Sequence, residues 1–241
     1  MAFFNFNTQK KIVCSVVVVA GGSSQRFGSD KLFATLSGIP VLAYSLTTIE
    51  ACKYVNEIIV VTELEKITAV ADLCEKFNIS KATKIVCGGE TRLESALSGI
   101  SETDRNSNLI AIHDGARPLV TKEIIEKTIE CAFDNKAAVP AVYSKDTVKI
   151  VSGGFVKETP ARECVYGIQT PQVFIPELIK GALTNALQKN ITVYDDASAV
   201  EVLGFPICIT EGSEENIKIT TPLDLKIAET ILQSRKRLDV L

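Results

Sequence analysis

The chain has 241 residues, 46% of them hydrophobic and 23% charged, with 26 basic and 29 acidic side chains. This balance is typical of a folded globular protein, and it excludes intrinsic disorder, collagen-like sequence and fibrous repeats. The formal net charge of −3 argues against non-specific binding of nucleic acid, which requires a basic surface. A local basic pocket for phosphate groups remains compatible with it. We therefore expect no nucleic-acid partner.

Histidine and cysteine limit the chemistry that is available. His113 is the only histidine, which excludes sites built from several imidazoles. The seven cysteines include no CxxC pair and fall mostly in apolar segments, as expected for core residues in a reducing cytosol. Lys10 and Lys11 precede an apolar run, as in a signal peptide, but the run is too short to span a membrane and no cleavage pattern follows. We expect a cytoplasmic protein with no membrane partner.

Short apolar segments alternate with segments of helical periodicity over the first 140 residues. The apolar run from Val13 to Ala20 is typical of a strand buried on both faces of a parallel sheet. Further strands are expected at residues 57–62, 84–87, 109–113 and 137–142, and helices from Pro40, over 67–77 and 93–100, and after a Thr121 cap. Pro140 predicts that its strand ends near a sheet edge. The alternation predicts an α/β fold with a Rossmann-like, mostly parallel sheet and helices on both faces.

The pattern changes after residue 145. Two β-rich segments flank Ser152-Gly153-Gly154, which is typical of a hairpin running from Thr147 to Thr159. A two-stranded ribbon is marginally stable in water, and this one carries apolar side chains that should not stay exposed. We expect it to be a dimerisation arm that packs on the same arm of a second subunit.

The loop from Ala20 to Lys31 is the first candidate binding site, since ligands bind beyond the carboxyl ends of parallel strands. Glycines after a strand allow backbone N–H groups to approach phosphate oxygens, and Arg26 and Lys31 would neutralise a triphosphate. The loop is neither a dinucleotide-binding fingerprint nor a Walker A motif. Taken alone, it is equally compatible with a tight turn carrying two solvated cations.

Three later segments also fall where loops are expected. Asp114 and Arg117 would either brace their loop or hold hydroxyls and an anionic group of a substrate. His113, at the end of an apolar strand, is expected to be a hydrogen-bonded structural residue and not a base. Gly88-Gly89 would bring N–H groups to a base or ribose, or simply lead into a helix. We interpret the pair Asp195-Asp196 as a helix cap and acidic first turn.

The order of these segments carries more information than any one of them. The series AGG-x3-RFG-x2-K, GGETR-x2-S, HDGARP, KDTVK, QTPQVF, YDDASAVE and NIKIT resembles the 2-C-methyl-D-erythritol 4-phosphate cytidylyltransferases of the non-mevalonate isoprenoid pathway. The resemblance runs from about Val13 to the C-terminal helix and implies one nucleotidyltransferase domain over residues 1–241, with a β-arm at about 145–167. Ribitol 5-phosphate cytidylyltransferases share looser forms of the motifs. A non-catalytic nucleotide-binding protein of the same fold is a third alternative, although it would not require every basic residue of the motifs.

The resemblance implies that CMP is transferred from CTP to the polyol phosphate, with release of pyrophosphate. It implies that Arg26 and Lys31 stabilise the transition state and that Arg162 and Lys218 hold the attacking phosphate. The implied CTP contacts are Ala20, Gly21, Gly22, Gly89, Glu90, Ser95 and Gly115, and the implied substrate contacts are Asp114, Arg117, Thr147 and Thr170. Mg²⁺ is expected to bind mainly through the CTP phosphates, with Asp114 as a candidate ligand. Thr147 and Arg162 are expected to reach into the pocket of the partner in a homodimer.

Overall fold

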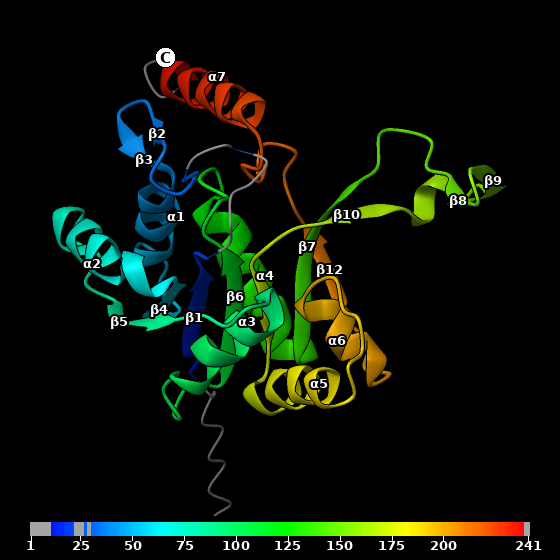
Figure 1. The fold of residues 1–241 in the computed structure, drawn as a ribbon, viewed down its shortest axis with the longest axis horizontal. Helices are drawn as coiled ribbons and strands as arrows, with labels where there is room; N and C mark the ends of the chain where they lie inside the picture. Colours follow the sequence, from blue (N-terminus) through cyan, green and yellow to red (C-terminus); the bar gives the residue numbers. More distant parts are fainter. Residues whose placement is uncertain (1–10, 22–26, 28–29, 239–241) are drawn as a thin grey trace, which may run out of the picture.

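A mostly parallel sheet forms the centre of the molecule (Figure 1). The computed structural model describes residues 11–21, 27 and 30–238. Four parallel strands lie in the order β6, β1, β4 and β5, with bounds Leu109–Asp114, Cys14–Val19, Val55–Thr62 and Ala82–Cys87. Strand β1 therefore has a neighbour on each side, and both of its faces are covered by helices, which explains why its side chains apart from Ser15 are apolar.

The remaining strands extend the sheet beyond β6. Strand β11 (Gln172–Phe174) pairs antiparallel with both β6 and β7 (Ala137–Tyr143). Strand β10 (Tyr166–Ile168) pairs with the end of β7, and β12 (Cys208–Glu211) lies parallel to β7 on its other side. The prediction that Pro140 ends its strand near a sheet edge is therefore wrong. A proline removes only one donor, and the Pro140 carbonyl still accepts a hydrogen bond from the Gln169 amide at 2.8 Å.

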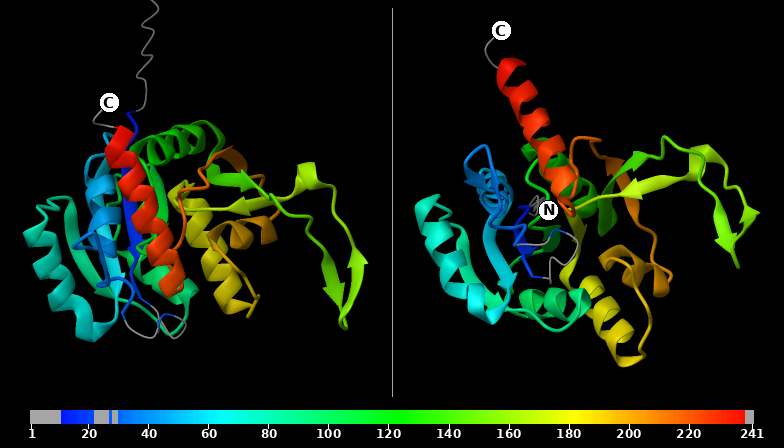
Figure 2. Two further views of the ribbon diagram at one scale, coloured as in Figure 1. Left: turned by 90° about the horizontal axis from the view of Figure 1, so that it is seen from above. Right: turned by 45° about the horizontal axis from the view of Figure 1, so that its top comes forward.

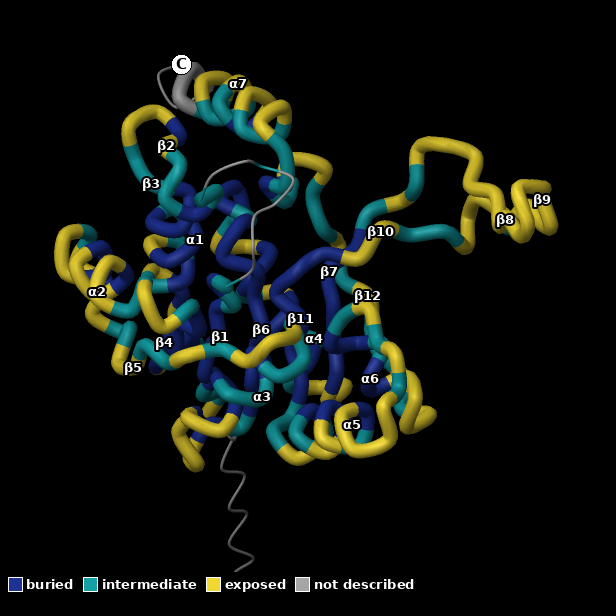
Figure 3. Tube along the Cα trace, in the orientation of Figure 1, coloured by how far each residue is buried: buried dark blue, intermediate teal, exposed yellow. Residues whose placement is uncertain are grey.

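Helices cover both faces of the sheet, as the alternation predicted. Helices α1 (Val41–Glu50), α2 (Ile67–Lys76) and α4 (Lys122–Asn135) pack on one face. Helices α3 (Arg92–Ser101), α5 (Pro176–Gln188) and α6 (Asp196–Val202) pack on the other. The side chains of β1 alternate between these two cores, with Val16 and Val18 in the first and Val17 in the second. Figure 3 shows the central strands buried between the two helical layers.

A smaller third cluster lies next to the carboxyl end of the sheet. Helix α7 (Pro222–Leu238) packs there against β2 (Thr35–Leu36), which forms a short hairpin with β3 (Ile39–Pro40). Leu36 and Ala228 are buried at this contact. Among the described residues, no helix combines the length and apolar character needed to cross a membrane.

A buried polar cluster joins the amino ends of the central strands. Glu57 of β4 accepts hydrogen bonds from the Ser15 hydroxyl of β1, at 2.5 Å, and from the Asp104 amide. The Ser15 and Ser107 hydroxyls lie 2.6 Å apart. The carboxylate is thereby satisfied at a position that is largely closed to water, as a buried charge requires.

Strands β8 (Ile150–Ser152) and β9 (Phe155–Glu158) form a separate antiparallel sheet that projects from the body (Figures 1 and 2). Gly153 and Gly154 join them with φ angles of +58° and +84°, a conformation that favours glycine. The hairpin is exposed along its length in Figure 3, and the Phe155 side chain is 80% exposed.

Candidate active site

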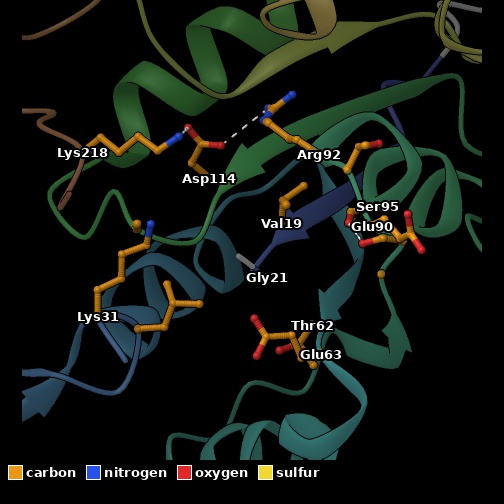
Figure 4. A pocket seen from close by; sticks show the side chains of 15 residues that line it. Val19, Gly21, Lys31, Thr62, Glu63, Glu90, Arg92, Ser95, Asp114 and Lys218 are labelled. Carbon is orange, nitrogen blue, oxygen red and sulfur yellow. Dashed lines mark hydrogen bonds and ion pairs between the residues drawn. The ribbon is translucent and has the colours of Figure 1, made fainter. Parts of the chain in front are cut away.

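A pocket lies where β1, β4, β5 and β6 end, the edge at which α/β sheets bind ligands (Figure 4). Seven of the residues expected at the site line it: Gly21, Lys31, Gly89, Glu90, Ser95, Asp114 and Lys218. They come from four separate segments of the chain. The fold thus gathers the glycine loop, the start of α3 and the end of β6 around one space, as the motif order predicted.

The glycine loop leaves β1 at Ala20. The Ala20 amide donates to the Val61 carbonyl at 2.7 Å, and its carbonyl accepts a hydrogen bond from the Thr62 hydroxyl at 3.2 Å. These bonds fix the start of the loop to β4. Gly22 and Arg26 lie outside the described residues.

Asp114, the last residue of β6, is the centre of a charged cluster that we call the charged side of the pocket: Asp114, Lys218, Arg117 and Arg92. The Asp114 carboxylate lies 2.8 Å from Lys218 Nζ, 3.7 Å from Arg117 Nε and 3.5 Å from the Arg92 guanidinium. Burial raises the pKa of Asp114, but Lys218 and Arg92 outweigh it and bring that pKa well below its ordinary value. Asp114 is therefore ionised at neutral pH and orients the cations around it.

Thr170 and His113 support Asp114 from the sheet side. The Thr170 hydroxyl accepts a hydrogen bond from the Asp114 amide at 3.1 Å and lies 3.0 Å from His113 Nδ1. His113 is fully buried, and burial lowers its pKa to about 4. The ring is neutral at pH 7, and the tautomer sets which of Nδ1 and the Thr170 hydroxyl is the donor in this hydrogen bond. The expectation that His113 is a hydrogen-bonded structural residue is confirmed.

Arg92 links the pocket to α6, a connection that sequence reasoning missed. Its guanidinium donates to Asp196 Oδ2 at 2.7 Å, and the Asp196 side chain is 1% exposed. Burial raises the pKa of Asp196, and the ion pair with Arg92 opposes that shift. Asp195 caps α6 by accepting a hydrogen bond from the Ser198 amide at 2.8 Å, so the expected cap and acidic first turn are both present. The partner of Arg92 is 104 residues away along the chain, and no local pattern signals it.

A second wall, the glycine side of the pocket, consists of Gly88, Gly89, Glu90, Thr91 and Ser95. Thr91 and Glu94 form a capping box, with the Glu94 amide donating to Thr91 Oγ1 and the Thr91 amide to Glu94 Oε2. The glycines pack closely on this first turn of α3. A Cβ atom added to Gly89 would lie 2.3 Å from the Glu94 Cβ, and one added to Gly88 would lie 2.6 Å from Ser95 Oγ. A side chain at Gly89 would therefore force the base of Glu94 to move, whereas one at Gly88 would require the Ser95 hydroxyl to turn away.

Gly115, expected at the ribose, lies one residue from the pocket wall. Its amide donates to the Val19 carbonyl, and its carbonyl accepts a hydrogen bond from the Ser45 hydroxyl, each at 3.0 Å. The neighbouring Ala116 lines the pocket. Gly115 thus holds the strand end against β1 and α1, which places Ala116 at the wall.

Thr147 and Arg162 lie at the base of the hairpin. The Arg162 guanidinium donates to Thr147 Oγ1 at 3.1 Å, and both side chains are exposed. Neither residue lines the pocket in the described part of the same chain. Of the cations expected at the reaction centre, the described fold brings together Lys31 and Lys218, while Arg162 sits on a different surface.

A protein-bound metal ion would need several acidic, imidazole or thiolate ligands grouped at the site. Among the described residues, no three His, Cys, Asp or Glu side chains are grouped so as to hold one. The Asp114 carboxylate, the candidate ligand, is already engaged by Lys218 at 2.8 Å. This donor set does not make a cation cage, and any divalent ion would take most of its ligands from bound phosphates.

The sheet order, the glycine loop after the first strand and the lysines at the carboxyl edge define an α/β fold of the nucleotidyltransferase type. Comparison with known proteins is more specific. Residues 13–234 match the sequence model of the family described as 2-C-methyl-D-erythritol 4-phosphate cytidylyltransferase. The chain belongs to this family, which confirms the resemblance found in its motifs.

Individual relatives support the same family assignment. A curated 2-C-methyl-D-erythritol 4-phosphate cytidylyltransferase from Caldanaerobacter subterraneus subsp. tengcongensis is 44% identical over 91% of this chain and 98% of its own length. The solved structure of a 4-diphosphocytidyl-2C-methyl-D-erythritol synthase from Anaerococcus prevotii matches with a TM-score of 0.83 at 33% identity, covering 92% of this chain and 97% of that one. The Thermus thermophilus cytidylyltransferase structure matches with a TM-score of 0.71 at 26% identity, covering 90% and 98%.

Proposed function

We propose that the protein transfers the cytidylyl group of CTP to 2-C-methyl-D-erythritol 4-phosphate, in the synthesis of isoprenoid precursors. A phosphate oxygen of the polyol phosphate forms a bond to the α-phosphorus of CTP. The bond from that phosphorus to the bridging oxygen of the β-phosphate breaks, and pyrophosphate leaves with the electron pair. The observation that carries the proposal is the family match over residues 13–234, whose motifs meet at one pocket.

The described side chains suit this reaction. Nucleotidyl transfer needs alignment of the reactants and neutralisation of charge, and it needs no side-chain nucleophile. Lys31 and Lys218 line the pocket and supply positive charge, while the Asp114 carboxylate sets the position of Lys218 at 2.8 Å. We assign the glycine side, with Glu90 and Ser95, to the cytosine, and the loop at Ala116 to the ribose. Arg26 keeps its proposed role beside Lys31 at the transition state.

We propose that Mg²⁺ enters the site bound to the nucleotide. Bound to the triphosphate, it would neutralise the phosphate oxygens and hold them in one geometry. Asp114 is the one residue of this chain that we propose near it. Removing Mg²⁺ with EDTA should abolish pyrophosphate release, and adding it back in excess should restore the activity.

We also propose that the active site is shared between two subunits. The hairpin exposes Val148, Ile150, Phe155 and Val156, apolar side chains that a second copy of the hairpin would cover. Such a dimer would bring Thr147 and Arg162 of the partner subunit to the pocket, where Arg162 would bind the attacking phosphate.

Mixing two inactive variants tests the shared site. In a heterodimer of Arg162→Ala and Lys31→Ala chains, one site would carry both substitutions and the other would be intact. Subunit exchange should then restore activity to about a quarter of wild type if the chains pair at random. No recovery despite proven exchange would place Arg162 in the site of its own chain, and a monomer in sedimentation would refute the dimer.

The activity itself is tested by pyrophosphate release from purified protein, CTP and Mg²⁺ with each candidate acceptor in turn. We expect selective turnover of 2-C-methyl-D-erythritol 4-phosphate. Equal or greater turnover of ribitol 5-phosphate would favour the pentitol-specific alternative. No release with any sugar phosphate would refute both enzymatic assignments.

A further inference from the structure

Lys66 joins two acidic residues at the rim of the pocket. Its Nζ lies 2.8 Å from Asp30 Oδ2 and 2.7 Å from Glu63 Oε2. Asp30 directly precedes Lys31, Glu63 directly follows β4, and Lys66 is the last residue of the 3-10 helix η1 (Leu64–Lys66). The three side chains are 24 to 39% exposed, so water only partly screens their charges. The contact connects two segments that are 36 residues apart in sequence.

Asp30 in turn organises the backbone around Lys31. Its Oδ1 accepts a hydrogen bond from the Leu32 amide at 3.1 Å, and its carbonyl accepts one from the Ala34 amide at 3.0 Å. Leu32 is buried in the core, and its carbonyl accepts a hydrogen bond from the Leu42 amide. Lys31 therefore lies between a residue fixed by the core and a residue fixed by Lys66.

Lys66 also changes the electrostatic potential at the pocket. Glu63 lines the pocket, and Figure 4 shows it across the space from Lys31 and below Gly21. A carboxylate in that position would repel a bound triphosphate. The positive charge of Lys66 offsets part of the negative charge of Glu63 and Asp30, which reduces that repulsion.

We propose that Lys66 is a positioning residue for the nucleotidyl transfer, holding the segment Asp30–Ala34 on the end of β4 so that Lys31 faces the α-phosphate of CTP. The proposal rests on the proposed function. It assigns a role to a residue that lies outside every motif of the sequence and that does not itself line the pocket. The cluster of Asp30, Glu63 and Lys66 is called the rim latch below.

A structural ion pair and a positioning residue differ in what their removal changes. A partly exposed ion pair such as Glu63–Lys66 contributes little to the stability of the fold. Misplacing a reacting group by about 1 Å can cost roughly 10²-fold in rate. The rim latch should therefore affect kcat far more than it affects unfolding.

The test compares Lys66→Met with Lys66→Arg and with Lys76→Met, a matched change at the exposed end of α2. For Lys66→Met we expect kcat to fall about 10²-fold with little change in the KM for the polyol phosphate. Lys66→Arg should keep most of the activity, and Lys76→Met all of it. In a Lys31→Ala background, Lys66→Met should cause little further loss, because the group it positions is gone.

Hydrogen exchange supplies a readout that does not depend on turnover. In Lys66→Met the amides of Leu32 and Ala34 should exchange faster, whereas Lys76→Met should leave them unchanged. Unchanged exchange, a kcat within about twofold of wild type, or a full multiplicative loss on top of Lys31→Ala would each overturn the rim latch. Absence of pyrophosphate release by the wild type would instead refute the proposed function, and the exchange result would still decide whether the latch exists.

Discussion

The charged side and the glycine side of the pocket are held in place by different interactions. On the charged side, the Asp114 carboxylate is fixed by cations at 2.8 to 3.7 Å, and its backbone amide donates a hydrogen bond to the Thr170 hydroxyl. On the glycine side, Gly88 and Gly89 are fixed by contact with the first turn of α3, where even a Cβ atom would overlap. The charged side should therefore tolerate changes of volume but not of charge, and the glycine side should tolerate changes of charge but not of volume.

The largest effect should come from neutralising Asp114. Asp114→Asn keeps the size of the side chain but leaves Lys218, Arg117 and Arg92 close together without their common counter-charge. Breaking a fully buried ion pair costs about 3–5 kcal/mol of stability, and we expect a smaller loss here because the Lys218 side chain is 37% exposed. We also expect kcat/KM to fall by roughly 10²-fold, because Lys218 loses the group that orients it.

Urea unfolding and pyrophosphate release measure these two quantities. Asp72→Asn, on the exposed face of α2, is the matched control and should change neither. If Asp114→Asn were as stable and active as the wild type, the geometry of the charged side would not depend on the Asp114 charge, and the proposed difference between the two walls would be refuted.

The second prediction concerns pH, because the charged side rests on a neutral imidazole. The pKa of His113 is about 4 in the folded protein and 6.5 when unfolded. Between these values the unfolded chain binds more protons, so the stability contribution is complete above the unfolded pKa and is lost as the pH falls toward 4. The full loss corresponds to about 3 kcal/mol.

Urea unfolding at a series of values from about pH 7 to 4.5 measures the slope, which a His113→Gln variant should reduce. The Asp114 carboxyl, with its lowered pKa, titrates below this window and does not interfere. Equal slopes for the variant and the wild type would show that His113 is not the group responsible.

The smallest effect is expected on the glycine side. Gly89→Ala would force the Glu94 side chain and the loop apart, and overpacking of this kind costs about 1–3 kcal/mol. We expect this to appear as a rise of about tenfold in the KM for CTP, with less change in kcat. In Gly181→Ala, on α5, the added Cβ has no described atom within 4 Å, and that variant should be about 0.8–1 kcal/mol more stable. An unchanged KM for CTP in Gly89→Ala would show that close packing at Gly89 does not determine how the glycine side binds CTP.

Local patterns predicted local structure well. The apolar run at β1, the Thr121 cap of α4 and the acidic first turn of α6 all form where the sequence indicated, because each depends on neighbouring residues. Pro140 shows the limit of this reasoning. Other strands pair with its strand on both sides. They come from residues 166–174 and 208–211, and the local sequence around Pro140 does not specify these pairings.

The same distinction between local sequence and long-range packing applies to the residues of the site. Seven of the residues named from the motifs line the pocket, since most of them follow parallel strands whose carboxyl ends meet at one edge, whereas Thr147 and Arg162 lie on the hairpin. The ion pairs between Arg92 and Asp196 and between Lys66 and Asp30 depend on how distant segments pack. Lysines such as Lys66 are common on helix surfaces, and only the fold distinguishes this one from the others.

The buried cluster of Ser15, Glu57 and Ser107 has a consequence for folding. It sits where the register of β1 against β4 shifts, between Cys14 and Ser15. A strand that slipped by one residue would turn Glu57 away from these hydroxyls and from the Asp104 amide, leaving a carboxylate buried without donors. Misaligned pairing of β1 and β4 is thus penalised. The amino end of the sheet selects the alignment on which the pocket at the carboxyl end depends.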